Sequence, residues 1–171
     1  IGPAKPISNW DSYQSFSSKA RDGDNPNSPS TSDQAPSKID KLTTTANVDI
    51  LTGEANTKDT FQFSAAPVFG KNNADHITNF VSKGIFADTL AISKNAFGIS
   101  ASKASLAVVN DQKKFDKAAA SNSLFVYDTR DGGLYYNSDG ITKGFGEARG
   151  GLFVILDNKS ILSTSNISLI A

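Results

Sequence analysis

The chain has 171 residues, and its 17 basic and 17 acidic side chains leave a formal net charge of zero at pH 7. This balance predicts no strong attraction to nucleic acid or to an anionic membrane. No apolar run approaches the roughly eighteen residues that a membrane span needs. Cysteine is absent and His76 is the only histidine, which excludes disulfides, thiolate chemistry and a zinc site of several histidines.

The N-terminal residues 1 to 37 are poor in aliphatic side chains, and their second half is a mixture of Pro, Ser, Asn and Asp. Such a composition cannot bury enough apolar surface to order itself, which predicts an N-terminal segment and flexible linker ahead of a β-rich domain from 38 to 171. Trp10, Tyr13 and Phe16 recur at three-residue spacing and are either a helical turn that docks on the domain or an aromatic platform for a ligand. The Ile-Gly-Pro start, without an initiator Met or a signal peptide, is expected of a processed product or an excised piece.

From Ile39 onward, short runs of β-branched and aromatic residues are separated by Gly, Asn, Asp and Ser clusters, which predicts a mainly β domain. The segment from Ser100 to Ala120 is rich in Ala, Lys and Gln, and we expect one or two short helices there. Two β-prone runs flank an Asp-Gly-Gly sequence between Leu124 and Tyr136, which predicts a hairpin. Further strands are expected over Gly151–Leu156 and within Ile161–Ile170.

An Asp-x-apolar triplet recurs near the start of this domain, in Asp40-Lys41-Leu42, Asp49-Ile50-Leu51 and Asp59-Thr60-Phe61. The aspartates are nine and then ten residues apart. Recurrence at such a short period is typical of a stacked β-coil, in which each repeat supplies one turn and one short strand and cannot bury its apolar residue alone. We therefore expect the chain from Ile39 to Phe63 to wind in short rungs, with Leu42, Leu51 and Phe61 facing inward.

The segment DILTGEANTKDTFQF contains two of these triplets and resembles a degenerate copy of the nonapeptide G-G-x-G-x-D-x-apolar-x. That nonapeptide defines the calcium-binding β-roll of RTX (hemolysin-type) proteins. The resemblance implies that Asp carboxylates and turn carbonyls bind calcium between coils, with Asp40 and Asp59 on one edge. The alternative for the three aspartates is turn formation, because Asp side chains hydrogen-bond nearby backbone in loops before strands.

The resemblance extends from about Ile39 to Ile170. After the repeats, DTFQF is followed by ADHITNF, and then DTLAIS and YDTRDGGLYYNSDG follow in the order of the motifs after the β-roll in this family, most closely in its cyanobacterial members. It implies a short β-roll that continues into a β-sandwich-like cap. It also implies a C-terminal strand whose apolar ending, Ile167–Ala171, resembles type I secretion tails, and it implies no catalytic residue.

A second oxygen-rich loop, Asn137-Ser138-Asp139-Gly140, has acceptors on alternate residues and a glycine for the turn, as calcium loops often do. It is either a calcium loop or a plain hairpin turn, since it lacks the carboxylate at the twelfth position of an EF-hand. The candidate calcium ligands are therefore Asp40, Asp49, Asp59, Asn137 and Asp139.

These features predict a non-enzymatic secreted module, extracellular or at the cell surface, that serves extracellular assembly, surface attachment or type I export. Its expected partners are copies of itself or an extracellular matrix or polysaccharide. The alternatives are a subunit of an extracellular filament or surface layer and a carbohydrate-binding module with Trp10, Tyr13, Tyr135 and Tyr136 as stacking rings. An enzyme ranks last, because His76 lies on an alternating strand and is expected to face solvent.

Overall fold

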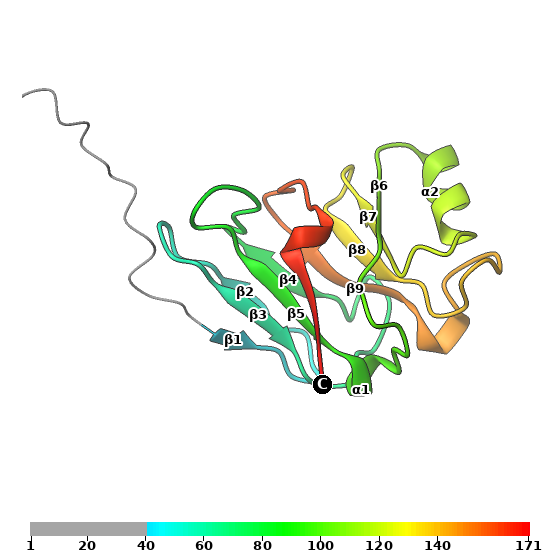
Figure 1. The fold of residues 1–171 in the computed structure, drawn as a ribbon, viewed down its shortest axis with the longest axis horizontal. Coiled ribbons are helices and arrows are strands. Elements are labelled where there is room, and N and C mark those ends of the chain that lie inside the picture. Colours follow the sequence, from blue (N-terminus) through cyan, green and yellow to red (C-terminus); the bar gives the residue numbers. More distant parts are fainter. Residues whose placement is uncertain (1–40) are drawn as a thin grey trace, which may run out of the picture. The chain divides into compact units, whose positions relative to one another are not determined.

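The computed structural model describes residues 41–171 (Figure 1). These residues belong to the second of the two units into which the chain divides, residues 33–171. The expected N-terminal segment and linker, the aromatic residues Trp10, Tyr13 and Phe16, and the candidate ligand Asp40 lie outside the described residues.

The described chain is mainly β, as the sequence predicts, with two sheets and two short α-helices. Sheet A has the strand order β1 (Lys41–Thr43), β3 (Thr60–Phe63), β5 (Thr89–Ser93) and β10 (Ile167–Ile170). Sheet B has the order β2 (Ile50–Thr52), β4 (Asp75–Thr78), β9 (Gly151–Leu156), β8 (Gly133–Tyr136), β7 (Phe125–Asp128) and β6 (Leu106–Val109).

The first five strands alternate between the two sheets, so the chain winds as a coil of short rungs. In sheet A, β1 pairs in parallel with β3, and β3 pairs in parallel with β5. In sheet B, β2 pairs in parallel with β4. Parallel neighbours need a crossover, and here the crossover is the strand in the opposite sheet. The expected winding of rungs up to Phe63 is therefore confirmed over the part that the structure describes.

One hydrophobic core lies between the sheets and receives side chains from both. Phe61, Leu90 and Ile77 are fully buried there, and each buried side chain of this size stabilises the fold by about 1.5–3 kcal/mol. Leu42 and Leu51 are half-buried and pack against the same core. Their partial exposure follows from their place on β1 and β2, which are edge strands among residues 41–171.

The predicted hairpin is formed by β7 and β8, which pair antiparallel. Gly132 in the connection has a φ of 80°, which an L side chain rarely adopts. A Cβ at Gly132 would also overlap the Leu156 carbonyl oxygen on β9. The glycine therefore permits both the turn and the close approach of β9, whose Leu156 N–H donates to the Gly132 carbonyl over 2.8 Å.

The prediction of one or two short helices within Ser100 to Ala120 is confirmed by one helix near the end of that range. The helix α2 (Gln112–Ala119) begins after Asp111, whose carboxylate accepts from the Lys114 backbone N–H over 2.8 Å and caps the helix. Residues 106–109 form β6 instead, because β7 offers a parallel partner and tertiary pairing overrides local propensity. A further short helix, α1 (Lys94–Phe97), follows β5 and was not predicted.

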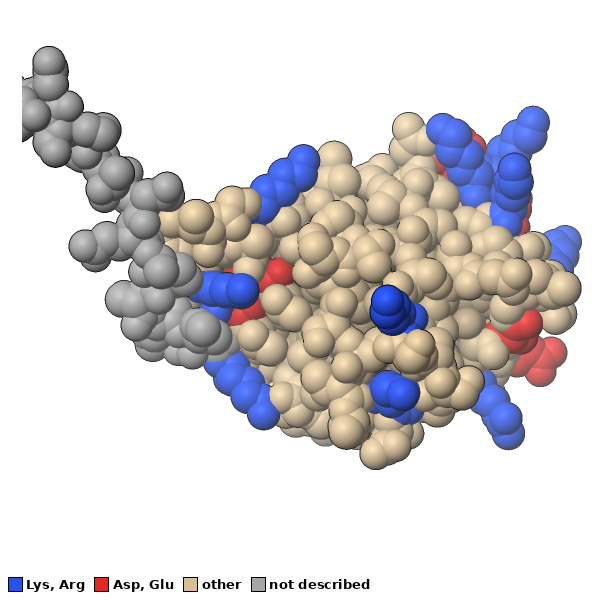
Figure 2. Space-filling view, in the orientation of Figure 1, with Lys and Arg blue, Asp and Glu red and all other residues tan. Residues whose placement is uncertain are grey.

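The two ends of sheet B differ in how they are covered. The helix α2 lies beside β6 and β7, far from β1 and β2 (Figure 1). Charged side chains of both signs gather over the α2 region, whereas most of the remaining face seen in Figure 2 is uncharged, with scattered basic and a few acidic side chains. No helix of residues 41–171 has the length and hydropathy that crossing a membrane requires.

The predicted C-terminal strands are partly confirmed. The strand β9 matches its predicted range, whereas within Ile161–Ile170 only the last four residues form a strand, β10. They follow a 3₁₀ helix, η3 (Thr164–Asn166), in which the buried Asn166 side chain donates to the carbonyls of Ser82 and Asp88. The β10 strand pairs in parallel with β5 and forms an edge of sheet A.

Candidate functional site

Four aspartates at the starts of successive rungs form a hydrogen-bonded series that we call the aspartate ladder: Asp49, Asp59, Asp75 and Asp88. In sheet B, the Asp49 backbone N–H donates to Oδ1 of Asp75 over 2.9 Å. In sheet A, the Asp59 backbone N–H donates to Oδ1 of Asp88 over 2.8 Å. The carboxylates of Asp75 and Asp88 therefore tie their own rungs to the preceding rung of the same sheet.

In three of the four ladder aspartates, Oδ2 of the carboxylate accepts a hydrogen bond from a backbone N–H group of the same turn. Oδ2 of Asp49 accepts from the Thr45 backbone N–H over 2.6 Å. Oδ2 of Asp59 accepts from the Glu54 N–H, and Oδ2 of Asp88 from the Val81 N–H, both over 2.8 Å. These are the turn contacts expected of Asp before a strand.

Burial changes the protonation of the ladder. Burial raises the pKa of Asp75 from 3.8 to about 6; the Asp49 N–H and the His76 charge lower this pKa, and the Asp49 charge raises it. Burial also raises the pKa of Asp88, against the hydrogen bonds from Val81 and Asp59 that lower it. The two buried carboxylates are thus held by backbone N–H donors in sites that disfavour the charged form.

The ladder does not fit calcium well. Calcium takes six to eight oxygen ligands, whereas the ladder oxygens face N–H groups that carry partial positive charge. Within the described part of the chain, no three residues of the types His, Asp and Glu are grouped so that they could hold a metal ion. The contacts of Asp49 and Asp59 match the turn-forming alternative, and Asp40 lies outside the described residues.

The other two candidate ligands lie together in the segment after β8, which we call the 137–146 loop. Asn137 is 3% exposed, and its Nδ2 donates to the carbonyls of Ser121 and Gly140 over 2.9 and 3.0 Å. Among residues 41–171, nothing lies within hydrogen-bonding distance of the buried Oδ1 of Asn137 or of the buried Oδ1 of Asp139. The loop therefore contains two buried acceptor atoms, two positions apart in the sequence, to which no described donor forms a hydrogen bond.

Close backbone packing holds the 137–146 loop. The backbone N–H and the hydroxyl of Ser138 both donate to the Phe145 carbonyl, over 3.2 and 3.0 Å. A Cβ at Gly150 would overlap that carbonyl and lie 2.7 Å from the carbonyl oxygen of Tyr136. Gly150 therefore permits the backbone of the loop end to lie against the end of β8.

An aromatic cluster lies on the outer face of sheet B beside this loop. The rings of Tyr135 and Phe145 are stacked at 5.0 Å, and Phe115 of α2 meets Tyr135 edge-on at 4.9 Å. All three side chains are half-buried. Tyr136, proposed with Tyr135 as a stacking ring, instead points into the core at 4% exposure, because successive side chains of a strand alternate between its faces.

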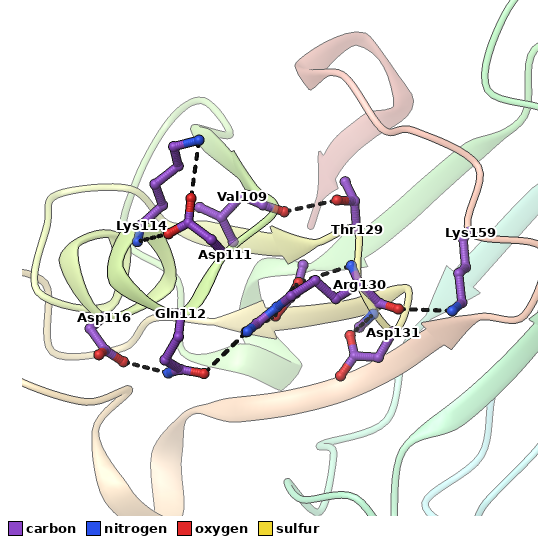
Figure 3. A network of polar contacts seen from close by, with 11 residues as sticks. Val109, Asp111, Gln112, Lys114, Asp116, Thr129, Arg130, Asp131 and Lys159 are labelled. Carbon is purple, nitrogen blue, oxygen red and sulfur yellow. Dashed lines mark hydrogen bonds and ion pairs between the residues drawn. The ribbon is translucent and has the colours of Figure 1, made fainter.

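Arg130 joins the β7–β8 hairpin to α2 (Figure 3). Its Nη2 lies 2.6 Å from Oδ2 of the buried Asp128, and it also donates to Oε1 of Gln112. Burial alone would raise the pKa of Asp128, but the hydrogen bonds from the Arg130 side chain and backbone outweigh it and lower that pKa. The network is structural, because it fixes α2 against the sheet.

His76 has a carboxylate partner that sequence reasoning did not assign. Its Nδ1 lies 2.7 Å from Oδ1 of Asp157, and both side chains are more than a third exposed. His76 faces the outside of β4, as the alternation predicts.

The sequence contained a signal for the two ladder members that were not among the candidate ligands. The Asp-x-apolar triplet occurs again in Asp75-His76-Ile77 and in Asp88-Thr89-Leu90. These copies follow longer turns, so a search at nearly fixed spacing does not find them. The order of residue types within the triplet, rather than its period, identifies the rungs.

No protein-family model, curated protein or solved structure matches this chain. The resemblance of its repeats to RTX proteins therefore stays a prediction.

Proposed function

We propose that the chain is a non-enzymatic module of the RTX type, secreted and extracellular or bound at the cell surface, which serves extracellular assembly, attachment or type I export. The observation that carries the proposal is the aspartate ladder. In a coil of parallel rungs tied by Asp carboxylates, each strand offers its backbone edge for pairing with the strand of the next rung, so further rungs can be added.

The first two strands of the described chain, β1 and β2, support self-association as the mode of assembly. Within residues 41–171, β1 and β2 are the edge strands at the same end of the two sheets. Ile50 on β2 is 73% exposed and the nearby Val48 is 48% exposed. An edge strand with unpaired backbone groups and exposed apolar side chains favours strand addition by a second copy.

The test is the oligomeric state of the full chain, measured by light scattering during size-exclusion chromatography with and without calcium. We expect concentration-dependent association that Ile50→Lys removes, because a charge on the outer face of β2 opposes strand addition. Ile161→Lys is the matched control, since Ile161 is 57% exposed and lies outside the strands. A chain that is monomeric under all conditions would refute the proposal that the module self-associates.

Calcium is the cation that we propose for the module. The argument is chemical, since the chain has no cysteine and a single histidine, and its remaining ligand atoms are hard oxygens. Calorimetric titration of the full chain with calcium tests this clause. Heat of binding is expected, and its absence at millimolar calcium would remove the clause while leaving the module proposal in place.

Carbohydrate binding is a second candidate, and a specific observation favours it. A shallow depression beside the 137–146 loop is lined by Tyr135, Phe145, Lys71 and Glu147, among others. Half-exposed rings flanked by charged hydrogen-bonding groups suit the apolar face and the hydroxyl rim of a sugar. Binding on a glycan array that Phe145→Ala abolishes would favour it; no binding to any glycan would count against it.

A further inference from the structure

In the 137–146 loop, two buried side-chain oxygens accept no hydrogen bond from residues 41–171, which requires an explanation in a native fold. Leaving a buried acceptor without a partner costs about 1–3 kcal/mol, and more for a charged group. Both atoms, Oδ1 of Asn137 and Oδ1 of Asp139, are buried, and their residues are only two positions apart in the sequence. A ligand that supplies positive charge to both would remove this cost.

The orientation of the Asn137 amide is fixed by its surroundings. Its Nδ2 donates to two carbonyls, of Ser121 and of Gly140, and a flipped amide would place an oxygen against both. Oδ1 therefore stays directed away from these carbonyls as an acceptor. The donorless oxygen is a property of the hydrogen-bond network and not of an arbitrary choice between nitrogen and oxygen.

Further oxygens lie around the same loop. Asp139 and Glu147 line one depression together with Lys143 and the glycines of the 144–151 segment. The main-chain carbonyls of Phe145 and Tyr136 both lie close to Gly150, and that of Phe145 already accepts from Ser138. A carboxylate, an amide oxygen, a second carboxylate and main-chain carbonyls are the donor types that calcium takes in protein loops.

We propose that the 137–146 loop binds one calcium ion through Oδ1 of Asn137 and Oδ1 of Asp139, and that the aspartate ladder binds none. The inference rests on the proposal that the module binds calcium, and it states where in the fold the ion binds. The ladder carboxylates already face backbone N–H donors, whereas the loop oxygens face no donor among residues 41–171. The cation therefore goes to the loop.

The experiment is calorimetric titration of the full chain with calcium chloride, for the wild type and three variants with the same substitution. Asp139→Asn removes the charge in the loop and keeps the side-chain shape. Asp49→Asn does so in the ladder, and Asp116→Asn does so on the exposed face of α2, where Asp116 contacts only Gln112. Melting of each protein in calcium and in chelator is the second measurement.

We expect one site in the wild type, at least about tenfold weaker binding in Asp139→Asn, and unchanged binding in Asp49→Asn and Asp116→Asn. Calcium should raise the melting temperature of the wild type but not that of Asp139→Asn. In chelator, Asp139→Asn should melt at or above the wild type, since it removes the charge from a carboxylate whose buried Oδ1 accepts no hydrogen bond within residues 41–171. A lower melting temperature in chelator would show that the carboxylate makes structural bonds and would overturn the inference.

The remaining outcomes separate this inference from the proposed function. Calcium binding that Asp49→Asn weakens and Asp139→Asn does not would refute the loop site while supporting a calcium-binding coil. No binding in any protein would refute both the loop site and the calcium clause. Binding at the loop in a chain that never self-associates would support the inference and count against self-assembly.

Discussion

The backbone N–H of Asp59 donates a hydrogen bond to Oδ1 of Asp88 over 2.8 Å, although 29 positions separate the two residues in the sequence. Both residues are fully or almost fully buried. The bond joins two rungs of sheet A at the point where each strand begins. The same contact recurs between Asp49 and Asp75 in sheet B, so it belongs to the repeat and not to one turn.

Asp88→Asn should destabilise the fold by about 2 kcal/mol. Both Asp88 oxygens accept from backbone N–H groups, of Asp59 and of Val81, and the amide would set a donor against one of them. Asp75→Asn is the matched control, because the single Asp49 N–H can still be accepted by the amide oxygen. Urea unfolding measures both variants, and equal losses would show that the second hydrogen bond of Asp88 contributes nothing.

The stability of the chain should depend on pH through Asp75. Its pKa is about 6 in the fold against 3.8 ordinarily, so the folded state binds the proton more tightly. The resulting stabilisation is fully present below pH 3.8 and is lost as the pH rises through about 6. The free energy of unfolding of the wild type, relative to Asp75→Asn, should therefore fall by about 3 kcal/mol from acid to neutral pH. A relative stability that rises over this range would show that Asp75 is stabilised in its charged form.

Arg130→Met should destabilise the fold more than Lys159→Met, because it leaves the buried Asp128 carboxylate without its ion-pair partner. The pKa of Asp128 is lowered in the fold, so this contribution is present above its ordinary pKa and is lost as the pH falls. The loss caused by Arg130→Met should accordingly shrink in acid. Lys159→Met is the control, since its exposed ammonium contacts only the Arg130 carbonyl. A loss that does not change between pH 7 and pH 3 would mean that packing, and not charge, is the cause.

Gly132→Ala should cost at least about 3 kcal/mol in thermal or urea unfolding. The new Cβ would overlap the Leu156 carbonyl in addition to the strain of a φ of 80°. Gly84→Ala isolates the strain, because Gly84 has a φ of 87° and nothing within 4 Å of an added Cβ. It should cost only about 1 kcal/mol. Similar losses in the two variants would remove the role given to the close approach of β9.

Local signals in the sequence predicted the parts of the fold that local physics decides. The Asp-Gly-Gly turn predicted the hairpin of β7 and β8, and the Asp-x-apolar triplets predicted the rungs that β2 and β3 form. Residues 106–109 lie in the range where one or two short helices were expected, and their composition does not identify them as a strand. Only the presence of β7 alongside, which is a tertiary contact, makes them a strand.

The candidate site was predicted in part for the same reason. The loop residues Asn137 and Asp139 were found from their alternating acceptors, which is a pattern within four residues. Asp75 and Asp88 carry the same triplet as the predicted rungs, but turns of different length obscure its period. The pairing of His76 on β4 with Asp157, the residue that follows β9, joins positions 81 apart in the sequence, and nothing local indicates it.

Diffraction from crystals of the full chain grown in calcium, with anomalous differences collected, tests the central claim most directly. We predict one anomalous peak beside Oδ1 of Asn137 and Oδ1 of Asp139, and none between the rungs that Asp49, Asp59, Asp75 and Asp88 begin. A peak among those four carboxylates, with the 137–146 loop empty, would contradict the account.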